Sequence, residues 1–416
     1  MFRRIASVVL AVVVAAACGR LHIGQKPAIR VGVLHSQSGT MAISEGPVVR
    51  ATLLAIDEIN AAGGLLGRRI EPIVVDGRSD PQTFAREARR LIVGENVSVI
   101  FGCWTSASRK MVKPEVEKLG HLLFYPVQYE GLESSPNIVY TGAAPNQQII
   151  PAVKWSFDKI GRRFFLVGSD YVFPHVANMI IRDHVNALRG EVVGEEYILL
   201  GSNDVDAIVR KIVVTRPDVI LNTINGDSNV AFFRALRAAG ISPHQIPTVS
   251  FSIGESELKT MPGLPMTGDY AVWNYFQAVE GDANRDFVRG YRTKYGPANT
   301  TSDPMEAAYF GVHLWAQAVI DAETDDVASV REAIKRQSWN APEGVVYVDP
   351  ENRHTWKTVR IGRVNDRGMF DIVWSSGRPV RPVPFPIFRT REAWERQLQS
   401  LHRRWGGSWA NPGTQP

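Results

Sequence analysis

The chain alternates strand-like and helix-like segments, and this alternation restricts its fold more than any other feature. Apolar strand-like segments occupy residues 29–34, 70–76, 97–101, 122–125 and 138–141. Helix-like segments with an apolar face lie between them, at residues 45–62, 81–94 and 106–119. This order is typical of a parallel sheet covered by helices. The first run therefore predicts one doubly wound α/β lobe.

A second run repeats the same pattern. Its strand-like segments are residues 164–168, 191–199, 219–223 and 248–252, and its helix-like segments are residues 174–188, 204–215 and 227–239. With 416 residues, 44% of them hydrophobic, the chain can bury the cores of two lobes. The small, Pro-bearing segment 142–147 suits a crossover between them. We predict an α/β protein of two doubly wound lobes in tandem.

The last third of the chain has no sheet of its own to complete. It reads as a strand at 270–276, helices at 282–295, 304–321 and 327–336, and strands at 344–349, 357–364 and 369–374. We therefore expect the chain to return to the first lobe and then to the second. The expected lobes are residues 29–143 with 277–353, and 144–276 with 354–388. Residues 389–416 are expected to form a tail that packs as a strap, with a short helix near 391–403.

The N-terminus has the form of an export signal. Arg3 and Arg4 precede an apolar stretch at residues 5–17, which is too short to span a bilayer about 30 Å thick. Three alanines then lead to Cys18, an arrangement similar to a bacterial lipobox. We predict a signal peptide at 1–17, lipidation of Cys18 or ordinary cleavage beside it, and a tether at 18–28. The protein is then periplasmic or on the cell surface, anchored to the membrane as a lipoprotein.

Charge and cysteine content argue against a nucleic-acid-binding protein and against a fold stabilised by disulfides. Without Arg3 and Arg4, the formal charge falls from +5 to +3, and the remaining basic residues are scattered along the chain. Nucleic acid is therefore not an expected partner. The chain has two cysteines, Cys18 and Cys103, so loss or lipidation of Cys18 leaves no disulfide within the mature protein.

Aromatic and neutral polar residues follow the predicted strands in both lobes. Ligands bind outside the carboxyl ends of the strands in open α/β sheets, so these residues are candidates for a site between the lobes. The candidates are Trp104, Thr105, Ser106, Tyr125, Val127, Gln128, Tyr171, Phe173, Asn225 and Glu255. Each also has a structural interpretation, since an aromatic residue can belong to the core and a serine can cap a helix.

The acidic candidates at these strand ends are Asp170, Asp227 and Glu255, and no strand-end Arg or Lys is seen to oppose them. A zwitterion would then find acidic partners for its positive group but no cation for its negative group, so a small neutral solute is favoured. Asp170 is more readily explained as a residue that braces its turn.

Enzyme classes find little support. A Cys103 nucleophile needs a base nearby, and none is seen at a strand end. The common hydrolase elbow, the phosphate-binding loop and the zinc-binding motifs are all missing from the sequence. We therefore expect a protein that is not an enzyme and that needs no cofactor or metal.

Five motifs resemble one known family. They are GCWTSASRK at 102–110, FYPVQYEG at 124–131, YTGAAPNQ at 140–147, GSDY at 168–171 and PEGVVYVDPENRHTW at 342–356. Together they resemble the urea-binding subunit of urea ABC importers and, more distantly, the amide-sensing regulator of aliphatic amidase operons. The resemblance covers roughly residues 28–384. It implies a type I periplasmic binding protein whose two lobes, joined by three crossovers, close around urea or a short amide and deliver it to the permease.

The resemblance also implies roles for single residues. Ser106 and Tyr171 match hydrogen-bonding positions, and Trp104, Tyr125 and Phe173 match aromatic walls. Trp104 and Phe173 stand where the amide sensor has tyrosines, and Val127 stands where it has a threonine, so the choice between urea and an amide stays open. Three alternatives also stay open: a sensor subunit for a membrane receptor or kinase, a branched-chain amino acid as ligand, and an amidohydrolase.

Overall fold

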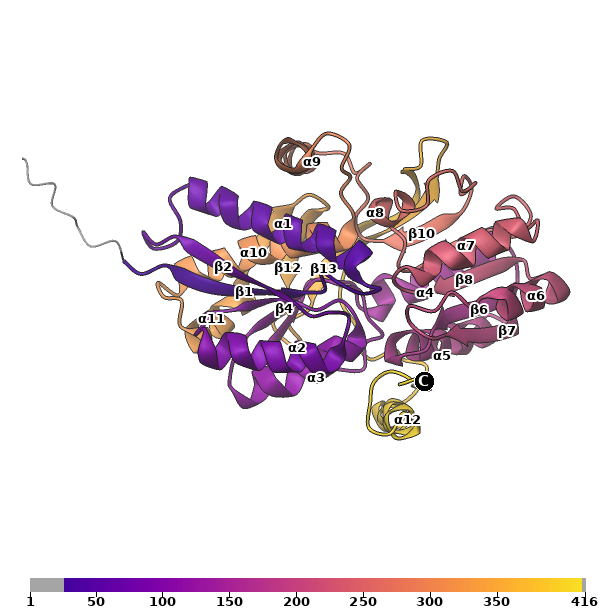
Figure 1. Ribbon diagram of the computed structural model, residues 1–416, viewed down its shortest axis with the longest axis horizontal. Helices are drawn as coiled ribbons and strands as arrows, with labels where there is room; N and C mark the ends of the chain where they lie inside the picture. The colour runs from indigo at the N-terminus through magenta and orange to yellow at the C-terminus, as the bar shows by residue number, and fades with distance from the viewer. Residues whose placement is uncertain (1–25, 414–416) are drawn as a thin grey trace, which may run out of the picture.

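The computed structural model describes residues 26–413 as two lobes that lie side by side (Figure 1). The predicted signal peptide and Cys18 lie outside the described residues. Within residues 26–413, no helix combines the length and the apolar character needed to cross a membrane.

The first lobe is built on a five-stranded parallel sheet with the order β2-β1-β3-β4-β5. Its strands are β1 (Ile29–His35), β2 (Ile70–Asp76), β3 (Ile100–Gly102), β4 (Leu123–Tyr125) and β5 (Ile138–Tyr140). Its helices are α1 (Ala42–Ala61), α2 (Pro81–Arg89) and α3 (Ser106–Lys118). Val31, Val33 and Leu34 of β1 are all fully buried, as expected for a central strand covered on both faces.

A larger, mixed sheet has the order β11-β12-β13-β10-β9-β8-β6-β7, and β14 pairs with β13. It forms the second lobe, except that β11 and β12 at one end of it pack into the core of the first lobe. Its strands are β6 (Arg163–Ser169), β7 (Glu191–Ile198), β8 (Val219–Thr223), β9 (Thr248–Ser250), β10 (Tyr270–Trp273), β11 (Ser338–Ala341), β12 (Gly344–Val348), β13 (Thr355–Val364) and β14 (Phe370–Val380). Its helices are α4 (Ile149–Lys159), α5 (Val172–Ala187), α6 (Asp206–Thr215), α7 (Ser228–Ala238) and α8 (Glu255–Leu258). Two buried apolar clusters cover its two faces.

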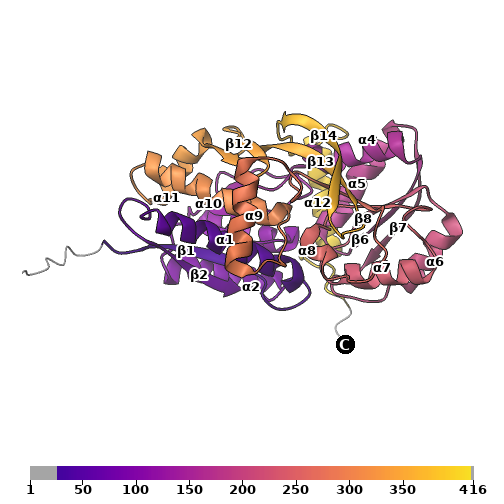
Figure 2. The same ribbon diagram turned by 90° about the horizontal axis from the view of Figure 1, so that it is seen from above.

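The chain then returns to the first lobe, as predicted. The returning helices are α9 (Asp282–Tyr295), α10 (Asp303–Asp321) and α11 (Val327–Ala333). Helices α9 and α10 pack against α1, and Figure 2 shows α9 crossing this side of the first lobe. After β14, the predicted tail helix is present as α12 (Arg391–Arg404) beside the second lobe.

Three segments cross between the lobes, and hydrogen bonds join them. Asn274, after β10, donates to the Gln147 carbonyl oxygen (3.1 Å) and to the Thr358 carbonyl oxygen (3.2 Å). Gln147 in turn donates to the Thr355 carbonyl oxygen (2.9 Å). We propose that the lobes divide in these segments, near the boundaries 143/144, 276/277 and 353/354.

The structure corrects the sequence prediction in four places. It adds α4, where we expected no helix, and β11, which pairs with β12 as a hairpin. The predicted helix 81–94 changes to a π-helical turn at Arg90–Gly94. Strand β14 runs to Val380, well past the predicted end at residue 374, because its long pairing with β13 extends it. These features depend on partners that are remote in the sequence.

Candidate functional site

In the turn between β3 and α3 the Ser106 hydroxyl is not needed to cap the helix, because a neighbouring residue does so. Thr105 is the N-cap, and its hydroxyl oxygen accepts from the Ser108 backbone N–H (3.1 Å). Gly102 is needed at the end of β3, since a Cβ there would lie 2.4 Å from the Leu34 carbonyl oxygen. The helix-capping role that the sequence allowed for Ser106 is thus performed by Thr105.

Cys103 lies in the same turn but has no features of a nucleophile. Its side chain is fully buried, and burial raises the pKa of the thiol well above its usual range. A thiolate is the reactive form of cysteine, so this environment suppresses its reactivity.

A buried ionic network lies beneath Ser106. The Ser106 hydroxyl donates to the Glu130 carboxylate and accepts from the Arg109 guanidinium (3.0 Å). Arg109 also donates to Glu130 (3.3 Å) and to Glu133 (2.9 Å), and Lys110 lies 2.9 Å from Glu133. Arg109 and Glu130 are fully buried. Because Ser106 gives its hydrogen to Glu130, it can only accept a hydrogen bond from a solute.

This network corrects the expectation that no strand-end cation is present. Arg109 and Lys110 occupy the first turn of α3, directly after the end of β3. Burial opposes the charge of Arg109, but Glu133 and Glu130 outweigh it and raise the pKa of the guanidinium. Three of its five N–H groups bond within the network, and its charge is paired with Glu130 and Glu133, so Arg109 supports Ser106 and is not an unpaired cation for a ligand carboxylate. The sequence did contain a signal for this contact, since Ser106 and Arg109 are three residues apart and therefore lie on the same face of α3.

The aromatic side chains of the first lobe pack above Arg109. The Arg109 guanidinium lies 4.7 Å from the ring centroid of Tyr125 and 4.5 Å from that of Tyr129. The Tyr125 hydroxyl donates to the Trp104 carbonyl oxygen (2.6 Å). Tyr125, like Ser106, therefore has no hydrogen left to donate to a solute.

The second lobe contributes Tyr171 and Phe173, whose ring centroids are 6.3 Å apart. Burial, followed by the nearby Tyr125 and Glu130, raises the pKa of Tyr171 well above its usual range. These neighbours belong to the first lobe, so the Tyr171 side chain lies close to the Ser106 network. Within residues 26–413 no hydrogen bond of its hydroxyl to another protein group is found, which leaves it able to donate or accept.

Direct contacts close the two lobes over the site. The Trp104 indole N–H donates to the Asn225 side-chain oxygen (3.2 Å), and Gln128 donates to the Phe251 carbonyl oxygen (2.8 Å). Thr40 donates to Asp227 beside them. Trp104, Ser106, Tyr171 and Asn225 are all at most 3% exposed. The structure is therefore a closed form, and entry of a solute requires these contacts to separate.

Two predicted site residues make their contacts at the crossovers. Glu255, at the start of α8, accepts from the Gln277 backbone N–H (2.7 Å), and burial raises the pKa of its carboxyl to about 8. Val127 is buried, and its backbone would lie 2.1 Å from a Cβ on Gly142. Both residues thus contact segments that cross between the lobes.

Asp170 is held by other protein groups. It accepts from the His175 ring (2.7 Å) and from the Asn411 side-chain amide (2.6 Å). Burial opposes ionisation of Asp170, but these hydrogen bonds outweigh it and lower the pKa of the carboxyl. The residue braces the turn that carries Tyr171, which agrees with the structural interpretation.

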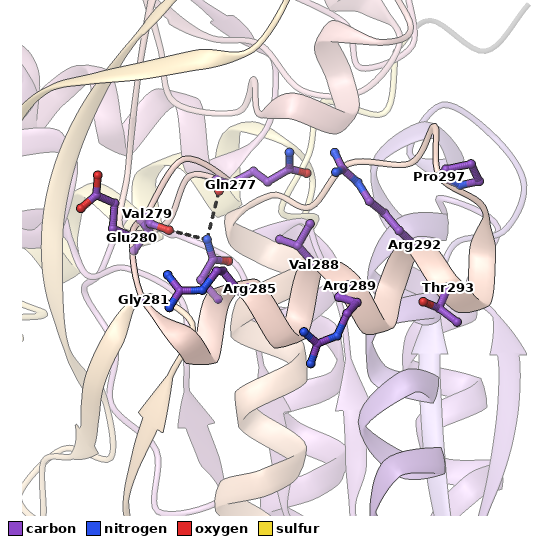
Figure 3. A pocket seen from close by; sticks show the side chains of 11 residues that line it. Gln277, Val279, Glu280, Gly281, Arg285, Val288, Arg289, Arg292, Thr293 and Pro297 are labelled. Carbon is purple, nitrogen blue, oxygen red and sulfur yellow. Dashed lines mark hydrogen bonds between the residues drawn. The ribbon is translucent and has the colours of Figure 1, made fainter.

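A surface hollow of about 880 Å³ lies along α9, away from the predicted residues (Figure 3). Arg285 and Arg289 on its rim pair with Asp282 and Asp286 of the same helix. No residue predicted for the site lines this hollow. Among residues 26–413, no group of three or more His, Cys, Asp or Glu side chains is placed to hold a metal ion.

A family model described as "Periplasmic binding protein domain" matches residues 29–391. The "Leu/Ile/Val-binding protein homolog 6" of Brucella melitensis is 25% identical over 349 residues, covering 81% of this chain and 87% of that protein. The "Limonene hydroxylase" of Geobacillus stearothermophilus is 32% identical over 117 residues, but the match covers only 28% of this chain and 21% of that protein.

Among solved structures, the chain is similar to the solute-binding protein of an ABC transporter from Rhodopseudomonas palustris HaA2, in complex with p-hydroxybenzoic acid. The TM-score is 0.77 at 23% identity, over 86% of this chain and 98% of that one. This likeness shows a common fold.

Proposed function

This chain belongs to the periplasmic binding protein domain family, and we propose that it captures urea or a short aliphatic amide between its lobes for an ABC importer. The hydrogen-bond polarity of the site is the observation that carries the proposal. Ser106 and Tyr125 have already donated their hydroxyl hydrogens to Glu130 and to the Trp104 carbonyl, so a solute must donate N–H groups to them.

The opposite side of the site supplies the complementary group. Tyr171, whose hydroxyl has no partner within the described residues, can donate to the carbonyl oxygen of the same solute. Trp104 and Phe173 would pack against its planar faces. A carboxylate placed at Ser106 would meet lone pairs and the Glu130 carboxylate, which disfavours a negatively charged group at that point.

Because urea is small, nearly every one of its hydrogen-bond donors and acceptors must find a partner in the site. At a ceiling of about 1.5 kcal/mol for each heavy atom, urea can gain roughly 6 kcal/mol, which corresponds to a Kd of roughly tens of micromolar. Lobe closure, which removes water from around the solute, supports this matching. The proposed mechanism is reversible closure with no chemical change of the solute.

We expect Tyr171→Phe to weaken urea or acetamide binding about tenfold, because the solute oxygen loses its donor. The free energy of unfolding should change little, since the hydroxyl bonds no other described residue. Isothermal titration calorimetry and urea-free thermal melts measure the two quantities. Tyr347→Phe, on β12, is the matched control, and equal affinities for both variants would remove Tyr171 from the site.

The function is tested by a thermal-shift panel of urea, formamide, acetamide and leucine, because a ligand of the folded state raises the melting temperature. Millimolar urea is dilute enough not to denature the protein, and thiourea provides a second urea-like solute. We expect urea or acetamide to stabilise the protein, and the same incubations to release no ammonia. Stabilisation by leucine alone would overturn the proposal.

A branched-chain amino acid is the second candidate, favoured by the similarity to the "Leu/Ile/Val-binding protein homolog 6" of Brucella melitensis. Its ammonium group would satisfy Ser106 and Tyr125, but its carboxylate would meet in Arg109 a cation that is already paired with Glu130 and Glu133. The leucine arm of the panel separates the two candidates.

We also propose that the protein works outside the cytoplasm, with a permease as its partner and Cys18 as its lipid anchor. Family membership supports the location. Cys18 lies outside the described residues, and its lipidation stays a prediction from the sequence.

A further inference from the structure

The C-terminal strap, residues 381–413, contacts both lobes. At its start, the Leu132 backbone N–H of the first lobe donates to the Pro384 carbonyl oxygen (2.8 Å). Arg389 then forms a two-pronged ion pair with Asp183 of α5 (2.6 and 2.8 Å). Trp394 of α12 is fully buried in the core of the second lobe. These contacts attach the strap firmly to the second lobe.

The end of the strap pairs with the turn that carries Tyr171. The Val172 backbone N–H donates to the Trp409 carbonyl oxygen (2.9 Å), and the Asn411 backbone N–H donates to the Asp170 carbonyl oxygen (3.0 Å). The Asn411 side chain adds its bond to the Asp170 carboxylate (2.6 Å). The strap thus adds a short strand edge to residues 170–172, on both sides of Tyr171.

The same end of the strap reaches the first lobe through Trp409. The Lys110 ammonium lies 4.9 Å from the centroid of the Trp409 ring, a cation–π contact. Lys110 is in the first turn of α3, which also holds Ser106. Its Nζ lies 2.9 Å from Glu133 and 3.6 Å from Glu130, so it belongs to the network beneath Ser106. Trp409 therefore bridges the helix that carries Ser106 and the turn that carries Tyr171.

We propose that Trp409 and Asn411 are positioning residues that hold the two halves of the binding site together and slow the release of solute. Asn411 orients Tyr171 through Asp170, and Trp409 ties that turn to α3 across the seam between the lobes. Opening of the lobes must separate Lys110 from Trp409. The inference rests on the proposed function in one respect: it assumes that the solute binds at this seam between the lobes.

The test compares Trp409→Ala, Trp409→Phe and Asn411→Ala in the otherwise unchanged protein, with Arg391→Ala on the exposed side of α12 as the control. Two readouts are measured: the dissociation rate of acetamide or urea by stopped flow, and amide hydrogen exchange at residues 106–110 and 170–172 without solute. Free energies of unfolding are measured for every variant.

We expect Trp409→Ala to raise the dissociation rate and the exchange at both segments roughly five- to tenfold, from the loss of a partly buried cation–π contact. Trp409→Phe should keep both quantities close to those of the unmodified protein, because phenylalanine still offers an aromatic face to the Lys110 ammonium. Asn411→Ala should increase exchange at 170–172 only. Arg391→Ala should change neither readout.

Two outcomes would overturn the inference. One is unchanged exchange at both segments in Trp409→Ala, and the other is a change fully explained by a lower free energy of unfolding, with Trp409→Phe no better than alanine. If neither solute binds the unmodified protein, the proposed function fails, while hydrogen exchange still decides the role of the strap.

Discussion

Arg109→Met is expected to lower the free energy of unfolding by about 3–5 kcal/mol and to abolish solute binding. The substitution leaves Glu130 and Glu133 buried without their main cationic partner, and an unpaired buried charge is costly. It also removes the donor that holds Ser106 and the cation that packs on Tyr125. Equilibrium denaturation with guanidinium chloride measures the loss.

Two further variants isolate the cause. Arg89→Met, which removes an exposed ion pair with Glu115, should cost less than about 1 kcal/mol. Adding Glu133→Gln to Arg109→Met should recover part of the stability, because the remaining Lys110 ammonium then has to balance the Glu130 carboxylate alone. A cost for Arg109→Met as small as that for Arg89→Met would show that the buried network does not stabilise the fold.

Glu255→Gln is expected to flatten the dependence of stability on pH. In the unfolded chain the Glu255 carboxyl ionises near its ordinary pKa of 4.5, whereas in the folded protein burial raises its pKa to about 8. Between these pH values the folded protein holds a proton that the unfolded chain has lost. The free energy of unfolding of the unmodified protein should therefore fall as the pH rises from about 4.5 to about 8.

At about 1.4 kcal/mol for each pH unit between the two pKa values, the contribution of Glu255 to the pH dependence is at most on the order of 5 kcal/mol. Glutamine keeps an oxygen for the Gln277 backbone N–H but has no charge to bury. Denaturation curves at a series of pH values should show a shallower slope for Glu255→Gln. Glu280→Gln, exposed in the neighbouring loop, is the control, and equal slopes for the two variants would exclude this role of Glu255.

Closure of the lobes links these effects to function. The network under Ser106 belongs to the first lobe, and Tyr171 comes from the second, so the proposed site is complete only when both are together. Glu255 contacts a crossover segment, where a change of charge would act on the hinge. The groups expected to control stability, Arg109 and Glu255, thus lie beside the proposed binding site and beside a crossover segment.

Local periodicity in the sequence is enough to predict several of the elements. Strands β2 and β8 and helix α9 have the predicted bounds, because apolar spacing and turn residues specify such segments without distant partners. The order of these elements predicted the α/β fold and the return of the chain to both lobes. The strand-end rule predicted that Trp104 and Asn225 share one region, and their hydrogen bond joins residues 121 positions apart.

The hydrogen-bond polarity of the site, and the contacts that hold its side chains, depend on long-range packing that the sequence pattern does not reveal. Arg109 meets Glu133 across 24 residues, and Asp170 meets Asn411 across 241 residues. Neither contact leaves a periodic signal, since a buried charge is stable only where folding brings its partner beside it. The capping role of Thr105, the acceptor role of Ser106 and the strap beside Tyr171 follow from such contacts. Local sequence specifies which segments form, whereas long-range packing specifies what their side chains can bind.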